Sequence, residues 1–202
     1  MPLIETALPV LALVAVLAYL LGSVPFGIVI ARAFGLGDLR AIGSGNIGAT
    51  NVLRTGNKVA AALTVVLDAG KGGLAVLIAR ALAGEDAAQL AGLAAFVGHC
   101  FPIYLGFRGG KGVATFLGTL LALAWPVGLA ACATWLVMAL VARYSSLAAL
   151  VAAALTPLWM VFLGYGTFIL LGICLTILIY IRHAPNLKRL KAGTEPKIGQ
   201  KG

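Results

Sequence analysis

Residues 43–54 read GSGNIGATNVLR, a polar, glycine-rich segment between two long hydrophobic runs. We call this segment the island. In a chain that is 61% hydrophobic, it gathers small side chains, a hydroxyl, carboxamides and an arginine. Glycines let the backbone approach a ligand closely, and successive N–H groups in such turns bind anions. Arg54 adds a rigid fork of donors suited to phosphate or carboxylate, so the island predicts an anion pocket at a membrane face.

Seven residues of the island are candidates for contact with substrate. An alternative interpretation is that Ser and Asn here only cap the start of a helix, but this accounts for one or two of them and not for their density. The candidates are Gly43, Ser44, Gly45, Asn46, Thr50, Asn51 and Arg54.

The glycines of the island also match another pattern. Gly43, Gly45 and Gly48 have the spacing G-x-G-x-x-G, and Asp68 follows about 20 residues later. That spacing indicates dinucleotide binding only after a strand, inside a soluble βαβ unit. A hydrophobic run of membrane length precedes it here, so we reject the nucleotide interpretation and expect no cofactor.

The composition identifies the class of protein. The chain has 202 residues, only 10% of them charged, and a mean hydropathy of +1.05. These values exclude a soluble domain and predict an all-α polytopic membrane protein. The net charge of +9 would suggest nucleic acid in a soluble protein, but in a membrane protein most of it follows from basic cytoplasmic loops, and the remainder suits an anionic substrate. We therefore expect no nucleic-acid partner and a single membrane domain over residues 1–202.

Seven membrane spans are expected, with the N-terminus outside and the C-terminus in the cytoplasm. The apolar run 113–142 is too long for one span and short for two, and it is interrupted at Trp125 and Pro126. Two short spans would place every basic loop on one side, so the positive-inside rule favours a hairpin. The expected spans are residues 8–30, which bend or end at Pro25, then 59–82, 87–105, two within 113–142, 145–163 and 167–181.

Other polar residues extend the candidate site. The turn GFRGGKG supplies Arg108, Gly109, Gly110 and Lys111, but it fails the Walker pattern for a phosphate loop. Asp68 and Lys71 share one helix face inside a span, where ionisable groups are either functional or paired with each other, and both interpretations stay open. His99 is expected to be structural. No cluster of acidic, His and Cys residues suggests a metal.

The tail after the last span carries further candidates. His183 and Asn186 flank Pro185 and could orient a hydroxyl or act as a base. Glu195 could neutralise or position a nearby cation, and Ser145 lies in a third turn at the same face. We expect the basic residues of the tail to contact anionic lipid head groups and Arg189 to be exposed; these residues are Lys188, Arg189, Lys191, Lys197 and Lys201.

Five motifs together resemble a known family. They are GSGNIGATNVLR, DAGKGG, GHCFPIYLGFRGGKGVATFLG, RYSSLAA and RHAPNLKRLKAGTEPKIG, and they extend over nearly the whole chain. The chain is similar to the bacterial acyl-phosphate:glycerol-3-phosphate acyltransferases. The resemblance implies seven spans in the bacterial inner membrane and a cytoplasmic active site. It also implies transfer of a fatty acyl group from acyl phosphate to the 1-hydroxyl of glycerol 3-phosphate, which gives lysophosphatidic acid and phosphate.

Residue roles follow from the same resemblance. Ser44, Arg54, Lys111, His183 and Asn186 would be catalytic, with Arg54 and Lys111 holding phosphates and His183 and Asn186 placing glycerol phosphate. The residues expected only to bind substrate are Gly43, Gly45, Asn46, Thr50, Asn51, Lys71, Arg108, Gly109, Gly110, Ser145 and Glu195. Either His183 or a substrate phosphate could take the proton.

The donor and the partners are also predicted. The His-x4-Asp pattern of CoA-dependent glycerolipid acyltransferases is absent, because Tyr104 follows His99 and Lys188 follows His183 at that spacing. Membrane lipid and the soluble enzyme that makes acyl phosphate are candidate partners. A transporter or flippase for a phosphorylated small molecule is the alternative function, and a structural subunit of a lipid-synthesis complex is a third.

Overall fold

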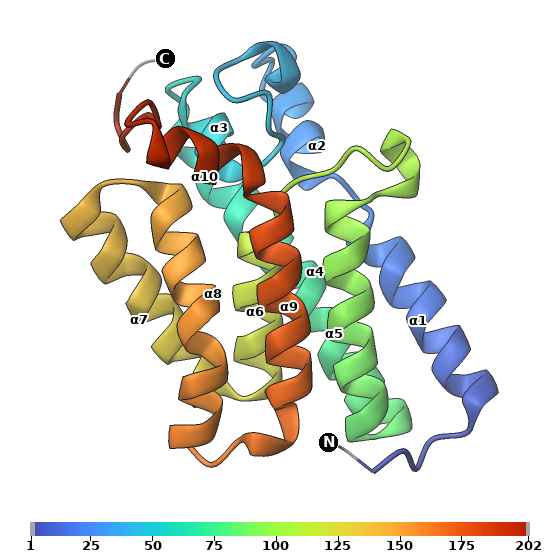
Figure 1. Ribbon diagram of the computed structural model, residues 1–202. Helices are drawn as coiled ribbons and strands as arrows, with labels where there is room; N and C mark the ends of the chain where they lie inside the picture. The colour runs from blue at the N-terminus through green and yellow to red at the C-terminus, as the bar shows by residue number, and fades with distance from the viewer. Residues whose placement is uncertain (1–2, 201–202) are drawn as a thin grey trace.

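A computed structural model describes residues 3–200, and every regular element in that part of the chain is helical (Figure 1). The predicted all-α class is therefore confirmed. The α-helices are α1 (Leu8–Gly22), α2 (Phe26–Ala33), α3 (Ala49–Leu53), α4 (Lys58–Ala83), α5 (Glu85–Cys100), α6 (Val113–Leu123), α7 (Trp125–Ala142), α8 (Ser145–Phe162), α9 (Ile169–Arg182) and α10 (Ala184–Lys191). Three 3-10 turns join them: η1 (Leu39–Ala41), η2 (Ile103–Leu105) and η3 (Gly166–Phe168).

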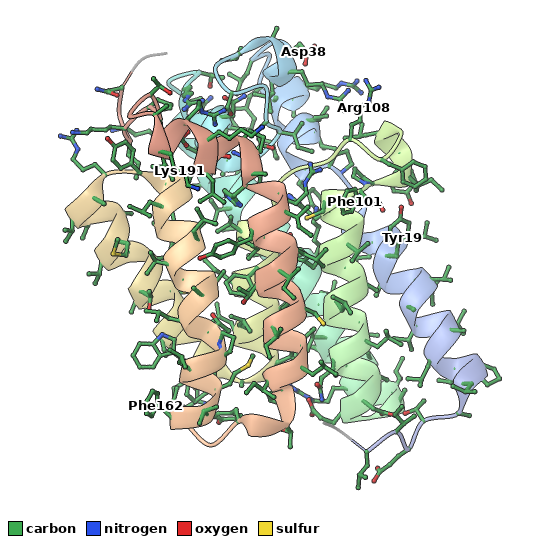
Figure 2. All side chains as sticks on the ribbon, viewed as in Figure 1. Tyr19, Asp38, Phe101, Arg108, Phe162 and Lys191 are labelled. Atoms are coloured by element: carbon green, nitrogen blue, oxygen red, sulfur yellow. The ribbon has the colours of Figure 1, made fainter. Side chains whose placement is uncertain are left out.

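Small residues let the long helices pack closely. A Cβ at Gly98 of α5 would collide with the Tyr19 carbonyl of α1, and one at Gly118 of α6 would collide with the Ala69 carbonyl of α4. Such contacts are the usual source of helix association in lipid, where apolar burial supplies little driving force. The hydroxyl of Tyr19 also donates to the Phe101 carbonyl over 2.7 Å, which ties α1 to the end of α5 (Figure 2).

The structure contains the predicted break in the first apolar run and divides the run 113–142 into two helices, although it does not show that both of these cross a membrane. Helix α1 ends at Gly22 and α2 begins at Phe26, so Pro25 lies in the break. The run 113–142 forms two helices, α6 and α7, which turn at Ala124. Trp125 and Pro126 begin α7 and do not themselves form the interruption, because proline is favoured in the first turn of a helix.

Fewer helices meet the length and hydropathy needed for a crossing than the seven spans that the sequence predicts. Five helical segments are long and apolar enough to cross a membrane, and a sixth is counted if the bent pair of α9 and α10 is one span. Helix α6 has only 11 residues, or roughly 16 Å at 1.5 Å per residue, against a hydrocarbon core of about 30 Å. The prediction of seven spans therefore stays a prediction, as does the orientation.

The polar segments meet at one end of the bundle, which we call the polar end (Figure 1). It comprises residues 34–57, 101–112, 143–144 and 183–200. Arg40 Nη2 donates to the Arg108 carbonyl over 3.3 Å, and the Ile198 amide donates to the Arg143 carbonyl over 2.7 Å. The predicted convergence of the basic loops is therefore present in the described chain, and the first described residues lie at the opposite end.

Two helices of the polar end were not predicted. Helix α3 lies within the island, and α10 crosses the polar end after a bend of 62° from α9. The predicted single domain also includes residues 1, 2, 201 and 202, which lie outside the described part.

Candidate functional site

Asn51 organises the island. Its side chain is 1% exposed, and its Nδ2 donates to the carbonyls of Leu39 and Ile42 over 2.8 and 3.0 Å. Its Oδ1 accepts from the Ser44 amide and from Arg54 Nη1, each over 3.3 Å. A direct contact with substrate would require Asn51 to give up bonds that fold the loop. The shared acceptor does, however, place Ser44 and Arg54 beside each other.

The backbone of the island makes room for the Arg54 side chain. Gly43 has a φ of 52°, in the left-handed region that favours glycine. A Cβ at Gly43 would lie 2.6 Å from Arg54 Nη1, so the guanidinium occupies the space that a side chain would take. Nearby, Thr50 Oγ1 lies 3.2 Å from Ser145 Oγ, which joins the island to the start of α8.

Arg182, which was not among the predicted site residues, holds the turn of residues 106–112, GFRGGKG, which we call the glycine turn. Its Nε donates to the Gly110 carbonyl over 3.0 Å and its Nη2 to the Gly109 carbonyl over 2.8 Å. Its guanidinium also lies 5.0 Å from the centre of the Phe101 ring. These contacts fix the backbone on which Lys111 follows directly. In the sequence, the only indication that Arg182 belongs to the site is its position next to His183 at the end of an apolar run.

Glu195 folds the tail back onto the bundle. It is 9% exposed, and its Oε1 accepts from Ser146 Oγ and from Asn186 Nδ2, each over 2.6 Å. Its Oε2 accepts from Arg189 Nε over 2.7 Å. Burial alone would raise the pKa of Glu195, but the bonds from Ser146, Asn186 and Arg189 outweigh this effect and hold the pKa below its usual value.

These contacts revise the expectation for Arg189. The sequence places it on an exposed tail facing lipid, whereas the structure pairs it with a buried carboxylate. Glu195 positions a cation, as the sequence suggested, and also holds Asn186. Because a carboxylate repels an anionic substrate, we interpret Glu195 as a positioning residue. The Oδ1 of Asn186 is buried and has no hydrogen-bond partner among residues 3–200, which leaves an acceptor for a ligand.

His183 lies between α9 and α10 and is 2% exposed. Its Nδ1 is 2.9 Å from the Ile179 carbonyl, and this contact requires the proton of the neutral ring to be on Nδ1. Nε2 then carries the lone pair, and it has no hydrogen-bond partner within residues 3–200. Burial and the nearby charge of Lys111 lower the pKa of His183 to about 4, although Ile179 and Glu195 oppose the shift. The ring is therefore neutral near pH 7.

Lys111 is at the centre of the charged groups. Burial lowers its pKa to about 8, against the attraction of Glu195 and with added repulsion from Arg189, Arg54 and Arg182. These effects need the groups to be close, so the island, the glycine turn and the tail converge. We call Ser44, Arg54, Lys111, His183 and Asn186 the catalytic cluster. The mutual charge effects on Lys111 and His183, the shared contacts of Ser44 and Arg54 with Asn51, and the contact of Asn186 with Glu195 place these five residues in one region of the polar end, and their catalytic role stays a prediction.

A second cationic feature lies beside this cluster. A cavity of about 350 Å³, which we call the arginine cleft, is lined by Arg40, Gly45, Ile47, Phe107, Arg108, Gly109 and Arg182. Arg108 is exposed there, at the polar end and on the side of the molecule away from Lys191 (Figure 2). A larger cavity of about 550 Å³ lies next to α2 and is lined by Arg32, Asp38 and Arg40 among others, but by none of the predicted site residues.

A family model named glycerol-3-phosphate acyltransferase matches residues 12–193. The chain belongs to the glycerol-3-phosphate acyltransferase family. A family member from Jannaschia sp. (strain CCS1) is 69% identical over 199 residues, or 98% of each chain. Another, from Cereibacter sphaeroides (strain ATCC 17025), is 67% identical and covers 100% of this chain and 96% of its own.

Two solved structures of a family member have the same fold. Both are crystal structures of PlsY, described as an integral membrane glycerol 3-phosphate acyltransferase. The glycerol 3-phosphate form has a TM-score of 0.88 at 41% identity and covers 94% of this chain and 96% of that chain. The lysophosphatidic acid form has a TM-score of 0.85 at 38% identity, covering 94% and 95%. The predicted family is confirmed, and with it an integral membrane transferase of phospholipid synthesis.

Lys71, which the sequence predicts to bind substrate, lies away from the catalytic cluster. Lys71 is 3% exposed inside the bundle, where its Nζ is 2.7 Å from Asp68 Oδ1 and donates to the Val24 carbonyl over 2.8 Å. Its ammonium is therefore used by the protein, as the alternative of a mutual ion pair indicated. Of the predicted substrate contacts, that of Lys71 therefore has the least support from the structure.

Proposed function

We propose that this chain transfers a fatty acyl group from acyl phosphate to the 1-hydroxyl of glycerol 3-phosphate at the catalytic cluster. The products are lysophosphatidic acid and inorganic phosphate. The observation that carries the proposal is that Lys111 lies close enough to Arg54, His183 and Glu195 for their charges to act on one another, while Asn186 Oδ1 is buried without a partner among the described residues. Membership of the glycerol-3-phosphate acyltransferase family supports the acceptor.

The chemistry needs positioning more than activation. An acyl phosphate is a mixed anhydride, so the acceptor hydroxyl attacks the carbonyl carbon and the C–O bond to phosphate breaks. The phosphate leaves with the electron pair of that bond. Cations that are fixed in place can stabilise a bound phosphate and the charge that develops during the reaction, which supplies much of the barrier reduction. Arg54 and Lys111 take this role, and Ser44 binds the donor phosphate or the acyl carbonyl.

The pKa of His183 bears on the choice of base. A group with a pKa of about 4 is a weak proton acceptor near pH 7, whereas the second pKa of a phosphate ester is about 6. We propose that His183 Nε2 accepts a hydrogen bond from the hydroxyl and orients it, together with Asn186. A substrate phosphate then takes the proton.

Two substrates with phosphate groups need two cationic places. The arginine cleft adjoins the island at Gly45 and the glycine turn at Gly109, so it supplies a second one next to the catalytic cluster. Ile47 and Phe107 give the cleft an apolar edge suited to a donor with a fatty chain. We assign Arg108 to this role, in agreement with its predicted contact with substrate.

The proposed location is the bacterial inner membrane, with the polar end in the cytoplasm. The concentration of Lys and Arg in the polar segments supports this orientation through the positive-inside rule. A soluble enzyme that makes acyl phosphate would meet the protein at this end. The transporter alternative has no comparable support, because both cavities described above lie at the polar end.

The test uses purified protein in detergent with hexadecanoyl phosphate and glycerol 3-phosphate and without added metal. We expect release of phosphate and formation of lysophosphatidic acid in equal amounts. Hexadecanoyl-CoA in place of the acyl phosphate should give no turnover. A comparable rate with the CoA thioester would reject the proposed donor, and no acylation with either donor would reject the activity.

A further inference from the structure

Three ionisable side chains meet inside the bundle, away from the proposed chemistry. Asp68 and Lys71 of α4 are each 3% exposed, and His99 of α5 is 6% exposed. Asp68 Oδ1 lies 2.7 Å from Lys71 Nζ and 3.5 Å from His99 Nδ1. Ionisable groups within a span are costly and are usually functional or paired. None of the three belongs to the catalytic cluster or lines the arginine cleft.

On one side, this group reaches the break between α1 and α2. Lys71 Nζ donates to the Val24 carbonyl over 2.8 Å and lies 5.7 Å from the centre of the Phe26 ring. Irregular backbone at membrane depth is tolerated only where the protein satisfies it. Helix α2 then leads to the island, and Gly27 packs so tightly against the Ile47 carbonyl that no Cβ would fit between them. Lys71 thus fixes the start of α2, the helix against which the island packs.

On the other side, the group reaches the glycine turn. The His99 carbonyl accepts from the Gly110 amide over 3.1 Å, and the imidazole occupies the space where a Cβ of Gly110 would lie. Beyond the turn, Thr115 Oγ1 donates to the Asp68 carbonyl over 2.9 Å. The group is therefore in contact with the chain on both sides of Lys111.

We propose that Asp68, Lys71 and His99 form a positioning network that holds the island and the glycine turn at a fixed separation, so that Arg54 and Lys111 act on the same substrate. The inference rests on the proposed function. The competing interpretation is an ion pair that only specifies packing of the bundle, which buried pairs also do. The two interpretations differ in what happens to turnover when folding is preserved.

Two separate variants test the network. One is the double substitution Asp68→Asn with Lys71→Met, and the other is the single substitution His99→Gln. Asp68→Asn alone leaves a buried ammonium without its partner and would destabilise the protein. The double variant leaves neither charge, so its Tm in detergent should stay near that of the wild type. Its kcat/KM per folded molecule should nevertheless fall by roughly tenfold to a hundredfold, mainly in kcat, because small misplacements of catalytic groups cost this much.

The matched control is Arg80→Met with Glu85→Gln. This ion pair, with an N–O distance of 2.9 Å, links the C-terminal end of α4 to α5 at the far end of the bundle. Its loss should leave kcat/KM unchanged per folded molecule. If the network acts through Lys111, the double variant should also cost much less in a Lys111→Met background than in the wild type.

Three results would overturn the inference. They are full kcat/KM in the folded double variant, an equal loss in the Lys111→Met background, and an equal loss in the Arg80 and Glu85 control. These outcomes are distinct from failure of the proposed function, which would appear as absence of acyl transfer in the wild-type protein itself.

Discussion

Arg54→Lys should damage catalysis far more than its unchanged charge suggests. The guanidinium lies against Gly43 and uses one N–H on Asn51, which leaves four of its five donors for a ligand. Lysine keeps the charge but loses the planar fork that binds phosphate through two bonds. Removal of one preorganised donor costs about 2 to 4 kcal/mol, so we expect kcat/KM to fall roughly thirty- to a thousandfold.

Arg32→Lys is the matched control. Arg32 is an exposed arginine at the C-terminal end of α2, near the same end of the bundle, but it lies outside the catalytic cluster and the arginine cleft. Arg189 would be a poor control, because its guanidinium is paired with the buried Glu195. Phosphate release should be measured for both variants at saturating hexadecanoyl phosphate and varied glycerol 3-phosphate. Equal, mild effects would mean that Arg54 only contributes a positive charge on the cytoplasmic side and that the anion pocket does not lie at the island.

Two further predictions concern pH and topology. Lys111 is positive below its pKa of about 8 and neutral above it, so kcat/KM should fall as the pH rises through about 8. Lys111→Arg should move this decline to higher pH. A decline at the same pH in the variant would assign the titration to another group. Single cysteines placed at Glu85 and Lys197, in a variant without the native cysteines, should react with an impermeant maleimide from opposite faces of the membrane. Labelling of both from one face would exclude the seven-span arrangement.

The fold class could be predicted because hydropathy and charge act locally along the chain. A span needs about 20 apolar residues, and the run 113–142 is too long for one such span, so a break within it is expected without any knowledge of neighbouring helices. The length of α6 was harder to predict. Whether an 11-residue helix crosses or only enters the membrane depends on the helices that cover its ends, and those contacts do not appear in a linear pattern.

The sequence could predict which polar segments meet at the polar end, but not the contacts that each of their residues makes. Asn51 and Asn186 are both carboxamides in polar segments, and the sequence assigns both to substrate. The structure distinguishes them by their partners, because Asn51 uses its donors and acceptor on the loop around it, whereas Asn186 keeps a buried Oδ1 without a partner among the described residues. Those partners depend on tertiary contacts.

The roles of Gly43 and Gly110 also depend on tertiary contacts that the sequence does not reveal. Local reasoning explains a glycine by a turn or by close approach of a ligand. Gly43 does have a positive φ, but its missing side chain also makes room for Arg54, and that of Gly110 makes room for the imidazole of His99. In both places the glycine admits a protein side chain that orients the site. A substitution at either glycine should therefore act on Arg54 or on the turn before Lys111, even where it touches no substrate.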